Sequence, residues 1–410
     1  MKSQFTIKAE LGFVLMLIGV QLGTAIRNVF HIELVNLLMV LSFLFVIDYR
    51  NLSRLRFPSW NKGFKWIIIF DIVEFIYLIF NFGTISEFLQ YHLYLLFIII
   101  AISTQTKDLH INRLSIFLFI TTAFISITVG YQATQGFSGI YTENVFYNET
   151  TNSSGLAEGG DKITMGRALL LCIISCIVFF FKGKYFPIIC SGLIAVSFIG
   201  LFMFGTRASM ACAFLCLFLY IGKKYGFNIF ASQKLKLSFV FILFFLGIIY
   251  SSTSYVQESL DTYTEGLLRG VFTMFGSNEY GTDASTITRY YTMQKAFSFW
   301  NAENFSIITM VVGHGYFPFY IDVPVIQAFY DFGCWGFLYF FIMVLLPIRY
   351  IMKRTDNDAI IIIQLFAVQY LLDQFYCALP YYHFQFMPLI LLLFFYSNNR
   401  KNYYKAKTFG

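Results

Sequence analysis

The sequence predicts an all-α polytopic membrane protein. Hydrophobic residues make up 58% of its 410 residues and charged residues only 12%, and the mean hydropathy is +0.67. Because a soluble domain carries about 25% charged residues, this chain has too little polar surface for a water-facing globule. Apolar runs close to the roughly 20 residues that cross a hydrocarbon core recur along the whole chain. These runs are continuously apolar instead of alternating, which excludes a β-barrel.

The apolar runs predict twelve transmembrane helices. Because the number is even, both termini lie on the same side of the membrane. The predicted spans cover residues 10–28, 31–47, 66–83, 88–103, 114–130, 165–181, 185–204, 208–221, 237–251, 325–348, 359–378 and 383–396.

The distribution of Lys and Arg predicts that both termini are cytoplasmic. With the N-terminus inside, all but seven of the 29 Lys and Arg residues fall in cytoplasmic loops and tails, as the positive-inside rule requires. This orientation explains the net charge of +7 without nucleic-acid binding, and it makes loop 223–236 cytoplasmic. The seven exceptions are Arg27, Lys162, Arg167, Arg207, Arg269, Arg289 and Lys295.

Two long polar loops then face outward. Loop 131–164 is rich in Gly, Ser, Thr and Asn and is predicted to be a flexible surface or lid segment. Loop 252–324 carries two helical patterns: an amphipathic surface helix that includes Val256, Leu260 and Tyr263, and a second helix over 286–300. The chain thus divides into an N-terminal membrane bundle (1–251), a large outward loop (252–324) and a C-terminal three-helix segment with a basic tail (325–410).

The sequence predicts neither a metal nor a cofactor. It has no Walker loop, no dinucleotide fingerprint, no His/Cys metal spacing and no Asp-x-Asp pair. All seven cysteines fall within apolar segments, so no disulfide framework is expected. Asp71, Glu74 and Asp373 are predicted intramembrane acids, which can mark a proton relay. We favour polar packing for them, because no intramembrane Lys or chain of histidines accompanies them, and we interpret His92 and His383 as satisfied histidines at the membrane rim.

Arginines at the outer rim are the best candidates for ligand binding. A guanidinium group matches the oxygen geometry of phosphate. Arg207 lies between two predicted spans among small residues that permit close backbone approach, and Arg167 lies in the first turn of a span. The alternative for each is a rim anchor or a partner for a nearby carboxylate.

These residues resemble the motifs of the O-antigen polymerase and O-antigen ligase superfamily. Gly205-Thr206-Arg207-Ala208-Ser209, opening an apolar span, is similar to the Ser/Thr-Arg-small motif of that family. The resemblance covers the layout of the chain and, in sequence, about residues 204–348. Its further motifs are Arg289 opening a loop helix, Val312-Gly313-His314-Gly315-Tyr316, Asp322, Ile326-Gln327, and Gly333-Cys334-Trp335-Gly336 entering a span.

The resemblance implies a GT-C-like helical fold at the outer face of a bacterial plasma membrane. It also implies an undecaprenyl-diphosphate-linked oligosaccharide as the substrate and a chain-length regulator protein as a possible partner. Polymerases of this family transfer the growing glycan from its lipid carrier to the next lipid-linked repeat unit, and ligases transfer a finished chain to a lipid A core sugar. Ligases place a histidine at the position where this chain has Asp322, so the polymerase is favoured over the ligase.

Such a transfer needs neutralisation of the diphosphate leaving group and a base for the acceptor hydroxyl. We expect Arg207 and Arg289 to hold the diphosphate without a metal, assisted by Arg167 or Arg269. The base is Asp322, on the positional argument, or His314, because an imidazole can accept a proton near neutral pH. Asp322 can instead be a plain helix cap, and Glu279 and Asp283 remain alternatives for the base. The aromatic residues predicted to stack on sugars are Tyr290, Tyr291, Trp300, Tyr316 and Tyr320.

A transporter, such as a flippase for the same lipid-linked sugar, is the competing class. It predicts short loops, internal pseudo-symmetry and charged residues around a central cavity. The sequence shows no internal repeat, and its longest ordered loop is on one side. The enzyme is therefore favoured.

Overall fold

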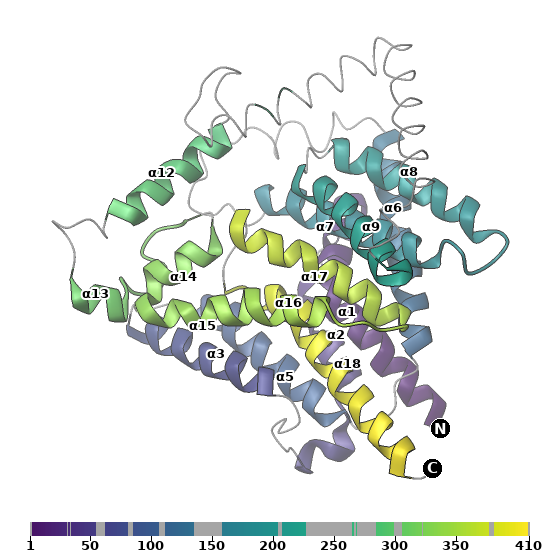
Figure 1. Ribbon diagram of the computed structural model, residues 1–410, viewed down its shortest axis with the longest axis horizontal. Helices are drawn as coiled ribbons and strands as arrows, with labels where there is room; N and C mark the ends of the chain where they lie inside the picture. Colours follow the sequence, from purple (N-terminus) through teal and green to yellow (C-terminus); the bar gives the residue numbers. More distant parts are fainter. Residues whose placement is uncertain are drawn as a thin grey trace.

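The computed structural model describes residues 2–30, 32, 34–54, 62–80, 85–105, 111–134, 158–203, 207–226, 265, 268, 284–298, 306–321, 323–376 and 381–408. The secondary structure of these residues is helical throughout, joined by short connections, and they contain no β-strand. The all-α class predicted from the sequence is confirmed (Figure 1).

The N-terminal half of the chain supplies most of the long helices. The first hairpin is α1 (Lys2–Phe30) and α2 (Val35–Val46), followed by a short 3₁₀ turn, η1 (Tyr49–Arg54). The helices that follow are α3 (Lys62–Phe80), α4 (Ile85–Phe88), the π-helical turn η2 (Leu89–Leu93), α5 (Tyr94–Thr104), α6 (Ile111–Thr134), α7 (Glu158–Phe179), α8 (Phe186–Met203) and α9 (Arg207–Tyr225).

The C-terminal half begins with two short helices of the long loop, α12 (Ala284–Ser298) and α13 (Ile307–Val312). Its last two helices are α17 (Asp358–Tyr376) and α18 (His383–Thr408). Between α13 and α17 lie α14 (Pro324–Phe332), the 3₁₀ turn η4 (Gly333–Trp335), α15 (Gly336–Phe340), the π-helical turn η5 (Phe341–Leu345) and α16 (Leu346–Ile351). The predicted span 325–348 lies within this series, which forms one helical segment from Pro324 to Ile351 with 3₁₀ and π-helical turns in it.

Local sequence explains several helix starts. Pro324 occupies the first turn of α14, where its missing N–H costs nothing and its fixed φ suits a helix. The side-chain oxygen of Asn357 accepts hydrogen bonds from the backbone N–H groups of Ala359 (3.1 Å) and Ile360 (3.3 Å). This is an N-cap, which satisfies amide groups that have no partner within the helix, and it begins α17 at Asp358.

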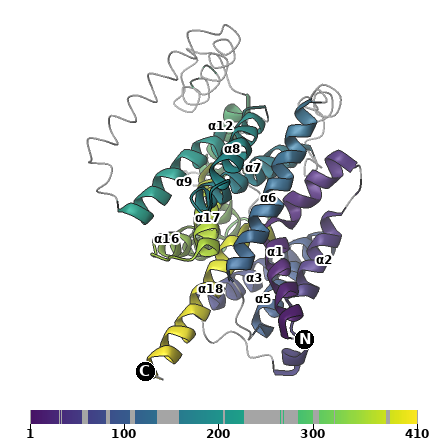
Figure 2. The same cartoon turned by 90° about the vertical axis from the view of Figure 1, so that its right-hand side faces the viewer.

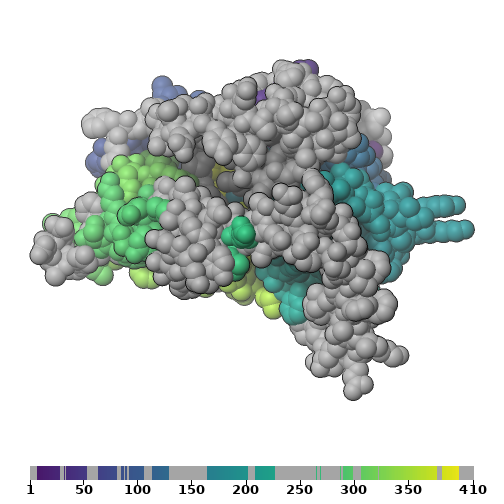
Figure 3. Space-filling model, turned by 90° about the horizontal axis from the view of Figure 1, so that it is seen from above, coloured from purple at the N-terminus to yellow at the C-terminus, as the bar shows by residue number. Residues whose placement is uncertain are grey.

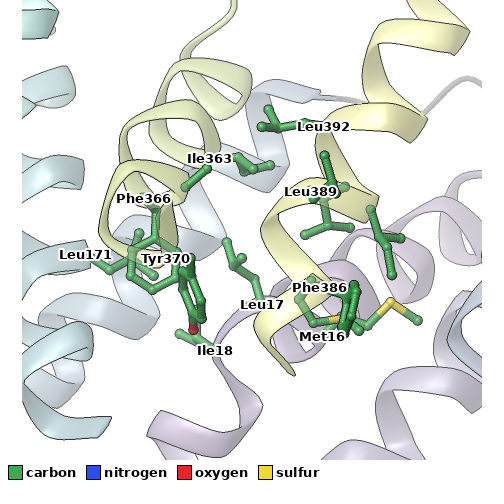
Figure 4. Packing of buried hydrophobic residues seen from close by; sticks show 14 of the residues in the cluster. Met16, Leu17, Ile18, Leu171, Ile363, Phe366, Tyr370, Phe386, Leu389 and Leu392 are labelled. Carbon is green, nitrogen blue, oxygen red and sulfur yellow. The ribbon is translucent and has the colours of Figure 1, made fainter. Parts of the chain in front are cut away.

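The core lies where α1, α7, α17 and α18 meet. Figure 4 shows Leu171 of α7 beside Phe366 of α17, with Leu17 of α1 between these and Phe386 and Leu389 of α18. All five are buried and belong to one continuous hydrophobic cluster. Because lipid tails are as apolar as these side chains, van der Waals packing holds such helices together, and it fixes the helices against which the polar groups described below are held.

The protein contains helices that can cross a membrane, which is the coarse part of the sequence prediction. Within the described residues, four helical segments are long and apolar enough: Ile7–Arg27, Ala208–Tyr225, Pro324–Ile351 and Asp358–Phe375. Shorter apolar helices accompany them: Val35–Val46, Tyr94–Thr104, Arg113–Thr128, Thr164–Phe179, Phe186–Leu201 and His383–Tyr396. The chain is therefore a membrane protein, and the number of twelve spans stays a prediction.

Some predicted segments fall outside the described residues. These are the span 237–251 and positions Val256, Leu260 and Tyr263 of the predicted surface helix. The predicted loop 131–164 is shorter than expected, because α6 continues to Thr134 and α7 begins at Glu158. The predicted helix 286–300 is confirmed as α12.

The arrangement of the helices separates two regions. The start of α1 and the end of α18 lie at the same end of the molecule in both ribbon views (Figures 1 and 2). Helices α12, α13 and α14 form one side of the molecule, and α8 and α9 lie toward the other (Figure 1). Seen from above, the green residues of the α12–α14 region and the teal residues of the α7–α9 region remain on opposite sides (Figure 3).

Candidate functional site at the return of the long loop

The Gly313-His314-Gly315 motif lies against the C-terminal end of α14. Helix α13 ends at Val312 with Gly313 as its C-cap. The next residues pair with α14 through hydrogen bonds from the His314 N–H to the Tyr330 carbonyl (3.0 Å) and from the Gly315 N–H to the Asp331 carbonyl (3.1 Å). Gly313 and Gly315 have φ angles of 79° and 102°, which glycine adopts without a steric penalty. The glycines that flank the histidine therefore shape a backbone that no other residue type fits easily.

Backbone packing at Gly313 and Gly333 fixes the crossing point. A Cβ atom at Gly313 would lie 2.1 Å from the Asp331 carbonyl oxygen, and one at Gly333 would lie 2.5 Å from the Met310 carbonyl oxygen. Gly333 also has a positive φ of 55°. The motif that was predicted from sequence as the beginning of a span is thus also the place where the long loop and the membrane helix touch.

The contacts of the His314 ring define which nitrogen can accept a proton. The ring stacks on the Tyr330 ring with centroids 4.2 Å apart and planes 4° apart. Nδ1 lies 3.2 Å from the Tyr330 carbonyl oxygen. A carbonyl can only accept, so Nδ1 carries the hydrogen and Nε2 of the neutral ring carries the lone pair. The side chain is partly exposed, which suits a group that meets a substrate.

Gln327 of α14 organises the backbone just before the predicted base. Its Oε1 accepts a hydrogen bond from the Ile321 N–H (2.5 Å), and its Nε2 donates to the Phe319 carbonyl (3.0 Å). Asp322 itself lies outside the described residues, whereas its neighbours Ile321 and Val323 are buried. Gln327 belongs to a motif predicted from sequence, and these hydrogen bonds indicate its physical role, because they hold residues 319–321 against α14.

Asp331 is a buried carboxylate that the sequence analysis did not single out. Its Oδ1 accepts from Gln327 Nε2 (2.7 Å), and its Oδ2 accepts from the Tyr381 hydroxyl (2.9 Å). Burial raises the pKa of the Tyr381 hydroxyl well above its ordinary value, so this group is a hydrogen-bond donor at neutral pH. Tyr381 has a φ of 63°, an uncommon value for a residue with a side chain. The hydrogen bond from Tyr381 to Asp331 therefore connects the segment before α18 to the end of α14, where residues 313–315 also lie.

The residues predicted to stack on sugars separate into two environments. Tyr290 and Tyr291 of α12 are 40% and 63% exposed, and Tyr320 is 38% exposed, so their rings are accessible. Tyr316 is buried and packs against Phe332 and Tyr381, which makes it part of the core. Trp300 lies outside the described residues.

Among the predicted diphosphate ligands, only Arg167 has a described side chain. Its Nε and Nη2 donate to Asp373 Oδ2 at 3.0 and 2.7 Å, and its guanidinium lies over the rings of Tyr370 (5.0 Å) and Phe384 (5.6 Å). The side chain is buried, and Gln369 donates to the other oxygen of Asp373 at 2.6 Å. Arg167 therefore ties α7 to α17, as the alternative of a carboxylate partner anticipated.

For the other predicted arginines, the structure describes either the backbone alone or no part of the residue. Arg207 is the first residue of α9, as the motif predicts, and Arg289 lies within α12. Their side chains and the whole of Arg269 lie outside the described residues. Joint binding of a diphosphate by Arg207 and Arg289 stays a prediction.

The structure brings together three buried groups that the sequence analysis treated separately. Asp71 and Glu74 of α3 lie beside His92 of η2, and His92 Nδ1 lies 3.0 Å from Asp71 Oδ1. His383 instead lies near Tyr94 and Tyr382. The signal in the sequence was the pair of acids three residues apart in an apolar run. What it could not give was the proximity of His92, because that depends on how two helices pack.

Comparison of this chain with protein-family models, with curated proteins and with solved structures gives no match.

Proposed function

We propose that the protein is a glycosyltransferase that polymerises lipid-linked oligosaccharide repeat units at the outer face of a bacterial plasma membrane. The placement of the segment that carries His314 and leads to Asp322 supports this proposal. An imidazole with an oriented accepting nitrogen lies on a glycine-shaped backbone where the long loop returns to the membrane helices. The exposed rings of Tyr290, Tyr291 and Tyr320 lie on or near the same loop segments, and they offer surfaces on which sugars stack.

The reaction requires one bond to form and one to break. The acceptor hydroxyl oxygen bonds to the anomeric carbon of the donor sugar, while the bond from that carbon to the diphosphate oxygen breaks. The hydroxyl proton passes to the base, and the electron pair leaves with undecaprenyl diphosphate. Arg207 and Arg289 stabilise the negative charge that develops on the diphosphate, and Asp322 or His314 accepts the proton.

A transporter of the same lipid-linked oligosaccharide is the second candidate. The observation that favours it is the buried group of Asp71, Glu74 and His92, since ionisable side chains within a membrane mark ion or proton pathways. The two functions differ in product: a transporter moves the repeat unit across the bilayer unchanged, whereas a polymerase lengthens it.

The decisive experiment uses the purified full chain in proteoliposomes with a synthetic undecaprenyl-diphosphate-linked repeat unit. We expect a ladder of longer glycans on a gel, together with released undecaprenyl diphosphate. Arg289→Lys keeps the charge but loses the two-pronged geometry of the guanidinium, so it should elongate poorly at normal protein level. Transbilayer movement of the repeat unit without any elongation would instead establish the transporter.

A further inference from the structure

The group formed by Asp71, Glu74 and His92 has the composition of a metal site. Each residue offers one ligand atom, and these three atoms lie within 4.8 Å of one another. Asp71 and Glu74 are three residues apart on α3, so they share one face of the helix. His92 comes from η2, and π-helical turns within helices occur frequently at functional sites. Two separate backbone features thus direct three ligand groups to one point.

Burying these groups in their charged form costs free energy unless a cation compensates the charge. Asp71, Glu74 and His92 are only 3%, 1% and 1% exposed. In the described part of the chain, no Lys or Arg pairs with either acid, and the buried Asp331 is close enough to Glu74 to interact with it electrostatically. A buried acid is neutralised by a proton, by a paired cation or by a metal. His92 pairs with Asp71, and a divalent ion would hold the carboxylate of Glu74 as well.

Two atoms of the group lack hydrogen-bond partners among the described residues. They are Glu74 Oε1 and His92 Nε2, and both are buried. Most buried side-chain polar atoms have at least one partner, and an unsatisfied one points to a missing ligand or a functional role. Glu74 therefore has a buried carboxylate oxygen without a hydrogen-bond partner among the described residues, which is the second, independent sign of a bound species.

The observed geometry suits one ion held by both helices. His92 Nδ1 lies 3.0 Å from Asp71 Oδ1, a hydrogen bond or ion pair in this structure. Ligand atoms about 2.0–2.1 Å from a tetrahedral Zn²⁺ lie about 3.3 Å apart, so an ion would take the place of the hydrogen between these two atoms. Carboxylate oxygen and imidazole nitrogen are common ligands of zinc and other divalent transition metals. The rings of Phe75 and Phe88, with centroids 5.8 and 6.0 Å from that of His92, form an apolar surround that limits access of water.

We propose that Asp71, Glu74 and His92 bind a divalent transition-metal ion of the zinc type, which joins α3 to the helix segment that carries η2. The site is separate from the His314 segment and takes no part in the glycosyl transfer proposed above. The test of this proposal measures metal content, so failure of the metal proposal can be told apart from failure of the proposed function.

The test measures zinc in the intact purified protein, loaded with Zn²⁺ in nanodiscs and washed with a weak chelator. We expect about one Zn²⁺ per chain in the wild type and loss of most of it in Glu74→Gln and in His92→Gln. Asp331→Asn is the matched control, because both oxygens of this neighbouring buried acid are already taken by Gln327 and Tyr381. It should keep its zinc.

A second measurement covers the case in which ligand variants fail to fold. Zn²⁺ should raise the melting temperature of the wild type, since an ion that binds only the folded state stabilises it. Substituted Co²⁺ should give the absorption of a site with nitrogen and oxygen ligands. Folded wild-type protein that binds no Zn²⁺ after loading would overturn the proposal, as would zinc that persists in Glu74→Gln and His92→Gln but disappears in Asp331→Asn.

Discussion

At the scale of single residues, Arg167 shows how burial changes the interpretation of a charged side chain. From its place in the first turn of an apolar run, the sequence analysis predicted that Arg167 either binds a diphosphate or pairs with a carboxylate. The structure gives it Asp373 and two aromatic rings. A guanidinium with these contacts would have to break them to reach a ligand, so its main role is to hold α7 against α17.

The ion pair between Arg167 and Asp373 gives the first prediction. Asp373→Asn should lower the free energy of unfolding by about 3–5 kcal/mol, because it leaves a buried guanidinium without its counter-charge. The double variant Arg167→Met/Asp373→Leu should regain most of this stability and still elongate glycans. Unfolding in detergent and the elongation assay measure both effects. A stable double variant that cannot elongate would make Arg167 a diphosphate ligand after all.

The identity of the base is a second question at this scale. Removing a general base typically slows a reaction by about 10²–10⁴-fold. We expect Asp322→Asn to bind the lipid-linked donor normally and to elongate it about 10²–10⁴-fold more slowly than the wild type. His314→Ala should lose less elongation activity. Donor binding and elongation are measured separately on the purified protein. Normal elongation by Asp322→Asn together with an inactive His314→Ala would reverse the assignment.

At the scale of elements, local patterns predicted helices well and helix contacts poorly. The apolar spacing over 286–300 gave α12, and Pro324 marked the start of α14. The span 325–348 was predicted from its apolar run, and one helical segment covers it. The close approach of Gly333 to the backbone of Gly313, twenty residues earlier in the sequence, does not follow from that run. Likewise, nothing in the spacing of Asp71 and Glu74 indicates His92, whereas the position of Arg207 at a helix start follows directly from its motif.

The crossing of Gly313 and Gly333 gives the third prediction. Gly313→Ala should destabilise the protein more than Gly226→Ala, although the two glycines have similar φ angles of 79° and 84°. Gly313 combines its positive φ with a ψ of −167°, a region essentially open only to glycine. It also adds a steric overlap, whereas nothing lies within 4 Å of a Cβ at Gly226. Thermal unfolding of the two variants measures the backbone strain and the overlap at Gly313 together. Equal losses of stability would mean that the crossing can relax.

At the scale of the whole molecule, polar contacts join segments that the charge distribution assigns to the same side. Lys182 and Asp358 form an ion pair at 2.6 Å, and Lys223 Nζ donates to Gln364 Oε1 at 2.6 Å. The backbone N–H of Asp48 donates to the Thr104 hydroxyl at 2.8 Å. Each of these residues lies at or near a helix end predicted to be cytoplasmic. If the predicted side were wrong for one of these helix ends, one of these contacts would join residues on opposite sides of the membrane.

The sidedness of the membrane gives the last prediction. A membrane-impermeant thiol reagent should label Ser154→Cys, in the predicted outward loop, on intact cells, and should label Ser232→Cys only after the cells are opened. The background for both is a variant in which the exposed Cys334 and Cys377 are replaced by Ser, since buried thiols of the core react slowly. The expectation rests on the excess of Lys and Arg in short loops, which resist translocation and so stay inside. Labelling of Ser232→Cys on intact cells would invert the topology, and it would put the His314 segment on the cytoplasmic side, where undecaprenyl-linked chains are not elongated in the proposed reaction.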